Sequence, residues 1–69
     1  MAKNKRQNKY AKEIINVEKI KIERGMYKYQ TNVKERALYT IQEMINWVTF
    51  DMPIALPFYE EAKTEIEKL

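Results

Sequence analysis

The chain has 69 residues, of which 45% are hydrophobic and 33% charged, and its formal net charge is +3. This length suits one small domain, and the hydrophobic content exceeds that of most disordered chains, so we expect it to fold. Cysteine and histidine are both absent, which excludes disulfides, thiol nucleophiles, thiolate zinc sites and imidazole catalysis. Because neither a secretory signal nor a run of about 20 apolar residues is present, we expect a cytoplasmic protein with no membrane partner.

Charge is unevenly distributed along the chain. Residues 1–12 contain five basic and no acidic side chains, whereas residues 51–69 contain two basic and five acidic ones. The first nine residues can bury almost no apolar surface. We therefore predict a flexible basic arm over residues 1–9 and a single small domain over residues 10–69.

The basic arm has a composition typical of segments that contact nucleic acid. Lysine and arginine neutralise phosphates, and amide side chains can add hydrogen bonds to the backbone or the bases. The alternative interpretation is a solubilising tail without a partner. The predicted nucleic-acid-binding residues are Lys3, Lys5, Arg6, Lys9, Tyr10 and Lys12.

Residues 13–30 are rich in β-branched apolar residues, which favour strands. These residues are Ile14, Ile15, Val17, Ile20 and Ile22. A turn over residues 24–25 would place four apolar side chains on one face of a β-hairpin, namely Ile20, Ile22, Tyr27 and Tyr29. The expected fold is therefore α+β, with an N-terminal β-hairpin packed on two α-helices.

The same segment also permits a helix from about Tyr10 to Arg24. Gly25 would end this helix by taking the C′ position. Glu18 and Lys21 would then lie inside its apolar stripe, which counts against the helix. An all-α three-helix domain is thus the alternative fold.

Residues 32–51 have the clearest helical pattern. Asn32 is a suitable N-cap, and Glu35 stands three positions later, as in a capping box. Pro53 ends the helix, because the residue before a proline is pushed out of the helical region. The apolar stripe at helical spacing comprises Val33, Ala37, Leu38, Ile41, Met44, Ile45 and Val48. A second helix is predicted from Pro57 to Leu69, and its narrow apolar face comprises Phe58, Ala62, Ile66 and Leu69.

The helix over residues 32–51 is apolar on a second side as well. Tyr39 and Phe50 lie roughly opposite the stripe, and Trp47 lies at its flank. Either the rest of the chain covers these rings or they form a contact surface, for which Trp, Tyr and Arg are the typical residues. The predicted protein interface comprises Arg36, Tyr39, Trp47 and Phe50.

Residue types that support catalysis are scarce. Serine is absent, glycine occurs once, and the glutamates of the last helix lack the spacing of a calcium loop. We therefore expect no enzyme activity, no metal and no cofactor. The predicted function is that of a nucleic-acid-associated accessory factor, with a basic arm and an interaction helix that pairs with a second copy. The alternative is a phage- or mobile-element-type inhibitor or adaptor that docks on a larger nucleic-acid-processing enzyme.

Overall fold

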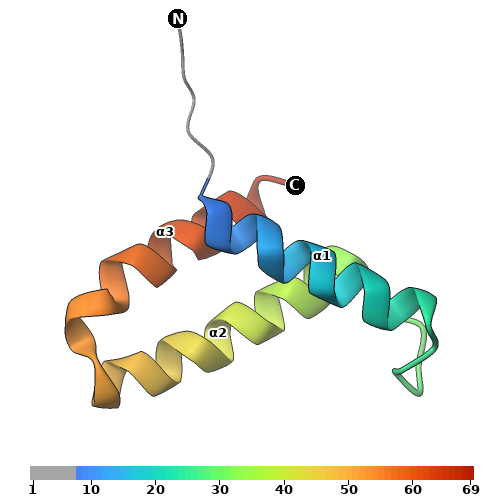
Figure 1. The fold of residues 1–69 in the computed structure, drawn as a ribbon, viewed down its shortest axis with the longest axis horizontal. Coiled ribbons are helices and arrows are strands. Elements are labelled where there is room, and N and C mark those ends of the chain that lie inside the picture. The colour runs from blue at the N-terminus through green and yellow to red at the C-terminus, as the bar shows by residue number, and fades with distance from the viewer. Residues whose placement is uncertain (1–7) are drawn as a thin grey trace, which may run out of the picture.

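The structure, a computed structural model, describes residues 8–69. They form three α-helices and one short 3-10 helix (Figure 1), which are α1 (Lys9–Glu23), α2 (Val33–Asp51), η1 (Pro53–Ala55) and α3 (Leu56–Glu67). No strand occurs between residues 8 and 69. The protein is therefore a three-helix all-α domain, and the expected α+β fold with an N-terminal hairpin is wrong.

Packing explains why residues 13–30 do not form the hairpin. Helical spacing aligns Ala11, Ile14 and Glu18 on one side of α1, and all three are buried against the other helices. An isolated two-stranded hairpin is only marginally stable in water, and no further strand is available in the described chain to extend it. The helix instead buries Ala11 and Ile14 in a core shared with α2 and α3.

Gly25 ends α1, as the alternative interpretation of the sequence predicts. Its φ is 67°, in the left-handed region that glycine adopts without strain. The N–H of Gly25 donates to the carbonyl of Ile22 at 3.0 Å, and the N–H of Met26 donates to that of Lys21 at 2.9 Å. This pair of hydrogen bonds is the Schellman ending, and it satisfies carbonyls that the last helical turn leaves free.

Asparagine is the N-cap residue of each of the two longer helices. Asn8 accepts hydrogen bonds from the N–H groups of Tyr10 and Ala11 at 3.0 and 3.4 Å. Its own amide donates to the carbonyl of Phe58 at 3.4 Å, which ties the start of α1 to α3. Asn32 is the N-cap of α2, as predicted, and it accepts from the N–H of Lys34 at 2.8 Å.

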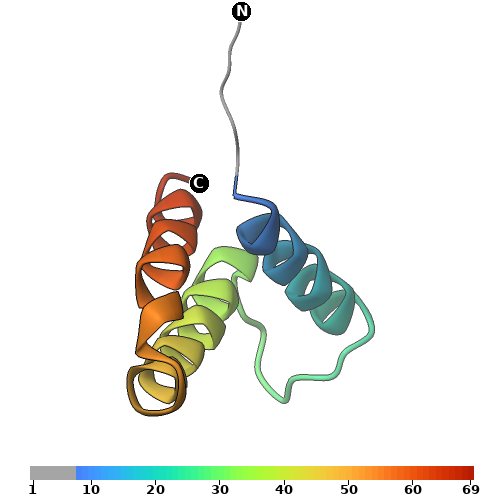
Figure 2. The same ribbon diagram turned by 60° about the vertical axis from the view of Figure 1, so that its left-hand side comes forward.

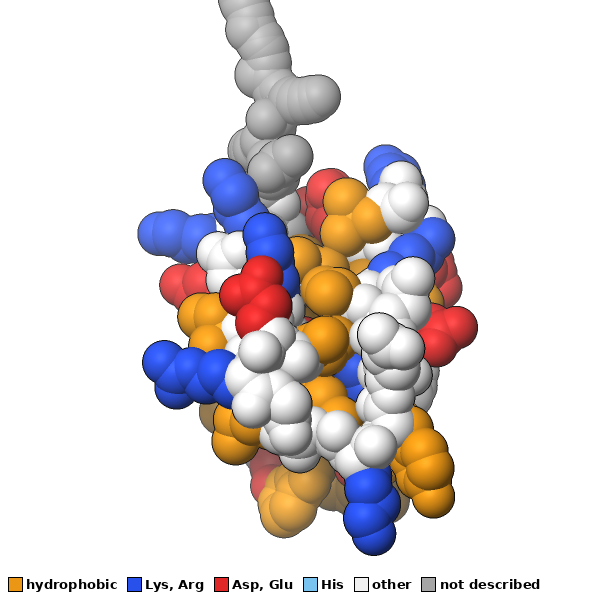
Figure 3. All heavy atoms as spheres, turned by 90° about the vertical axis from the view of Figure 1, so that its right-hand side faces the viewer, with side chains coloured by type: hydrophobic (Ala, Val, Ile, Leu, Met, Phe, Trp, Pro, Cys, Tyr) orange, Lys and Arg blue, Asp and Glu red, His pale blue; other side chains and the backbone are white. Residues whose placement is uncertain are grey.

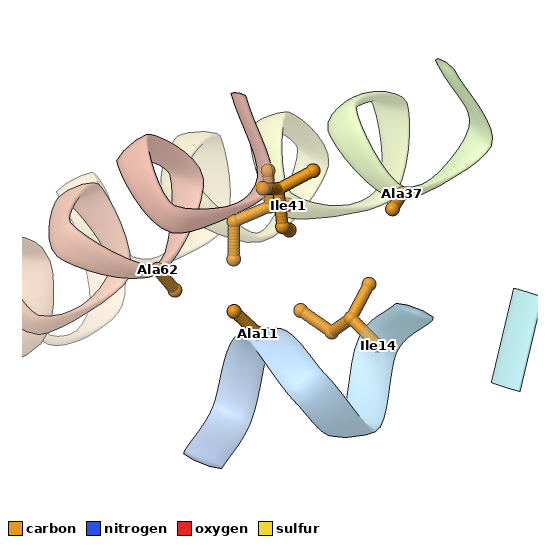
Figure 4. Packing of buried hydrophobic residues seen from close by; sticks show 6 residues of the cluster. Ala11, Ile14, Ala37, Ile41 and Ala62 are labelled. Carbon is orange, nitrogen blue, oxygen red and sulfur yellow. The ribbon is translucent and has the colours of Figure 1, made fainter. Parts of the chain in front are cut away.

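The core is small, and each helix contributes one alanine and one isoleucine to it. The six buried residues are Ala11 and Ile14 from α1, Ala37 and Ile41 from α2, and Ala62 and Ile66 from α3. Their side chains point toward one another between the helices (Figure 4). The alanines let the helix axes approach closely, while Ile41 and Ile66 are fully buried and fill the centre.

The molecule is thin in one direction. Its extents are 37 × 36 × 15 Å, and helices pack about 8–10 Å apart, so the short dimension holds one helix over another but no third layer. In Figure 2, α2 lies between α1 and α3. Because α1 crosses near the N-terminal half of α2 (Figure 1), the C-terminal half of α2 is covered mainly by α3 and η1, and Tyr10 of α1 reaches it only at Met44.

Candidate functional site

The C-terminal half of α2 carries two exposed aromatic side chains. Trp47 is 67% exposed and Phe50 is 86% exposed. They lie together in a shallow hollow of about 300 Å³ on the surface of this helix. We call this site the α2 hollow, and its lining residues are Glu43, Asn46, Trp47, Phe50 and Asp51.

Helix geometry explains this exposure. At about 100° per residue, Phe50 lies opposite the side of α2 that carries Ala37 and Ile41, and Trp47 lies at its flank. Burying such a ring typically stabilises a fold by roughly 1.5–3 kcal/mol, which the isolated chain does not gain here. Exposed apolar surface of this kind is typical of contact sites.

The other two predicted interface residues lie outside the α2 hollow. Tyr39 is exposed on the same side of α2 but nearer its N-terminal end. The guanidinium of Arg36 lies over the Tyr27 ring at 4.1 Å and over the Tyr39 ring at 5.0 Å. Its Nε lies 3.9 Å from Oε1 of Glu18. The structure therefore brings Trp47 and Phe50 together, while Arg36 is engaged within the chain.

Glu18 is a buried carboxylate that joins α1, the α1–α2 loop and α2. It is only 2% exposed. It accepts hydrogen bonds from the hydroxyl of Tyr27 and, at 2.8 Å, from that of Thr40. Lys21 Nζ lies 3.9 Å from its Oε2. The loop between the helices is thereby held against both of them.

The ionised form of Glu18 is stabilised despite its burial. Burial by itself raises the pKa of a carboxyl group, and it is the largest single influence on Glu18. The hydrogen bonds from Tyr27 and Thr40 and the positive charges of Lys21 and Arg36 act in the opposite direction. Together they hold the pKa of Glu18 below its usual value of 4.5. One feature of the sequence indicates that Glu18 is a buried link between helices: it is a glutamate inside the apolar stripe of α1.

Tyr10, predicted to bind nucleic acid, packs within the chain. Its ring centroid lies 4.9 Å from that of Tyr59 and 5.6 Å from that of Phe58. Its hydroxyl donates to Sδ of Met44 at 3.2 Å. Burial, the neighbouring Tyr59 and the charge of Glu13 raise the pKa of Tyr10 to about 12. This residue joins the three helices and is not free to stack on a base.

Lysines on the surface of α1 form a basic ridge. The basic ridge comprises Lys9, Lys12 and Lys19, all of which are exposed. Helical spacing places these lysines within about 80° of one another around the axis of α1. Lys12 also borders a hollow between α1 and α3 that Ala11 and Ile66 line. Figure 3 shows one face of the molecule, with lysine and arginine side chains projecting around its edge. Of the other predicted nucleic-acid-binding residues, Lys3, Lys5 and Arg6 lie outside the described residues.

The described part of the chain shows neither a metal-binding cluster nor a membrane-spanning helix. Among residues 8–69, no group of three or more acidic side chains could hold a metal ion. None of the helices between these residues combines the length and the apolar character that crossing a bilayer requires.

Comparison of the chain with protein-family models, with curated protein sequences and with solved structures finds no match. The residues and geometry of this chain are therefore the basis for assigning a function.

Proposed function

We propose that the protein is a non-enzymatic protein-binding domain whose contact surface is centred on the α2 hollow. The observation that carries this proposal is the side-by-side exposure of Trp47 and Phe50 on the side of α2 that the thin fold leaves uncovered. Tryptophan is the residue type most enriched among those that dominate binding energy, and such residues cluster at the centre of an interface. The α2 hollow offers such a centre.

Charge favours a different protein over a second copy as the partner. Glu43 and Asp51 both line the α2 hollow. A two-fold contact uses the same surface of both copies, so it would bring four carboxylates together. The dimer expected from the sequence is disfavoured for this reason. The proposed role is therefore that of an inhibitor or adaptor that docks on another protein.

A selection from a library of random peptides tests this function. Peptides that bind the wild-type protein are expected to lose about 30-fold in affinity on Trp47→Ala or Phe50→Ala, because a hot-spot residue contributes about 2 kcal/mol or more. Tyr29→Ala is the matched control, since Tyr29 is a ring of similar exposure, 79%, in the α1–α2 loop. The affinity of the Tyr29→Ala variant for the selected peptides should equal that of the wild type. Absence of binders, or binders that tolerate both substitutions in α2, would contradict the proposal.

The basic ridge favours nucleic acid as a second candidate partner. Lys9, Lys12 and Lys19 extend the basic composition of residues 1–6 along the outer face of α1. Because each lysine that contacts a phosphate releases counterions, affinity should fall steeply with salt.

Replacing the three lysines of the basic ridge with glutamine should therefore reduce this salt dependence. The slope of log affinity against log salt should fall by about one for each lysine that contacts a phosphate. Fluorescence anisotropy of a labelled oligonucleotide measures this slope, with Lys68→Gln, at the C-cap of the acidic α3, as the control. An unchanged slope would remove the basic ridge from the nucleic-acid contact.

A further inference from the structure

The α2 hollow has a negative electrostatic character. Its two ionisable lining residues, Glu43 and Asp51, are both acidic and exposed. Neither of them forms an ion pair with any basic side chain between residues 8 and 69. The last turn of α2 contains no basic residue, and the C-terminal end of a helix carries a partial negative charge of its own. The negative charges of Glu43 and Asp51 and the partial negative charge of the helix end therefore surround the exposed rings.

Aromatic rings next to carboxylates form a suitable site for a cation. A positive group is attracted to the face of an aromatic ring, and most strongly to that of tryptophan. The guanidinium of arginine is flat, so it can stack on a ring while its N–H groups donate to carboxylates at its edge. Trp47 and Phe50 supply the rings of the α2 hollow, and Glu43 and Asp51 supply the carboxylates.

The same protein contains a related arrangement, in which an arginine stacks on two rings beside a carboxylate. Arg36 lies over Tyr27 at 4.1 Å and over Tyr39 at 5.0 Å. The carboxylate of Glu18 lies 3.9 Å from its Nε, which makes no hydrogen bond within residues 8–69, so these two groups attract each other as charges only. In the α2 hollow, two rings and two carboxylates occur together, and no basic side chain of residues 8–69 lines it.

We propose that the α2 hollow binds an arginine side chain of the partner protein. The guanidinium packs against Trp47 and Phe50, and its N–H groups donate to Glu43 and Asp51. This inference rests on the proposed function, because the arginine belongs to the protein that docks on the α2 hollow. The inference requires a positive charge on the partner, which an apolar contact with the rings alone would not require.

Matched synthetic peptides test the proposal. The probe is a short, end-capped peptide of leucine, alanine and arginine, with the leucines on one helical face and the arginines beside it. Its twins carry glutamine or lysine in place of arginine. Trp47 is the only tryptophan of the chain, so its emission reports binding directly. We expect the arginine peptide to bind at least tenfold more tightly than the glutamine twin, and more tightly than the lysine twin.

The double variant Glu43→Gln, Asp51→Asn identifies the cause of this preference. Both residues are exposed, so the variant is expected to fold, and circular dichroism checks this. It should bind the arginine and glutamine peptides equally. Glu60→Gln with Glu67→Gln, two exposed glutamates of α3, is the charge-matched control and should keep the preference.

The outcomes separate the two proposals. If the wild-type protein binds the arginine and glutamine peptides equally, the arginine site is wrong and the protein-binding function stands. If neither peptide changes the emission of Trp47, both proposals fail. Sedimentation of the protein alone tests a second copy as the occupant, since Arg24 is exposed. Self-association that Arg24→Gln abolishes would overturn the assignment to a different protein.

Discussion

Ile41→Ala is expected to leave a large fraction of the protein molecules unfolded. Ile41 is fully buried where the three helices meet, and removing its side chain leaves a cavity that the small core cannot close. Such a truncation costs about 2–5 kcal/mol. A chain of this size has a total stability of only about 3–10 kcal/mol, at roughly 0.05–0.15 kcal/mol per residue. Chemical denaturation followed by circular dichroism measures the loss.

Ile54→Ala is the matched control for this prediction. It makes the same chemical change at a side chain in η1 that is 88% exposed, so its effect should stay within about 0.5 kcal/mol. Equal denaturation midpoints for the two variants would contradict the core described above.

Glu18→Ala is expected to destabilise the protein by about 3 kcal/mol near neutral pH. The substitution removes the acceptor of the Tyr27 and Thr40 hydroxyls and the carboxylate beside Arg36. Breaking a buried ion pair costs about 3–5 kcal/mol. The lower value applies here, because the basic partners Arg36 and Lys21 are partly exposed and screened by solvent.

The contribution of Glu18 should also depend on pH in a defined direction. Its pKa in the folded protein lies below the usual 4.5, so folding favours the ionised form. This stabilisation is fully present above pH 4.5 and is lost as the pH falls through the folded-state value. The free energy of unfolding should therefore differ most between wild type and Glu18→Gln near neutral pH, and the difference should shrink in acid. A difference that is constant with pH would contradict the assigned network.

Local signals in the sequence were sufficient to predict α2, while the end of α1 at Gly25 belonged to the alternative interpretation. Asn32 caps α2 and Gly25 ends α1 because both act through neighbouring backbone groups. The helical spacing also showed that Trp47 and Phe50 lie away from the main apolar stripe, and both are exposed in the structure.

The structure of α1 could not be decided from local preference. Its β-branched residues favour strands, but the deciding energy comes from packing Ala11 and Ile14 on two helices far along the chain. Val17 and Ile20 remain about half exposed as a consequence.

Long-range polar contacts were equally hidden from the sequence. Glu18 counted against a helix because it interrupts the apolar stripe, yet Thr40, 22 positions later, supplies it with a hydrogen bond. Arg36 and Tyr10 have the chemistry of binding residues, and the fold uses both for contacts within the chain. Residue type alone therefore identified candidates, and only the arrangement of the helices separated structural residues from those free to bind.

The most direct test of the central claim is quenching of Trp47 fluorescence in the free protein by acrylamide, together with sedimentation of the same sample. Because Trp47 is the only tryptophan and lies in an open hollow, a monomer should emit like a hydrated indole. Its quenching should be nearly as strong as in the urea-unfolded chain. A monomer whose tryptophan emission is blue-shifted and protected from acrylamide would show that the chain covers this ring itself, and the α2 hollow would not be a binding surface.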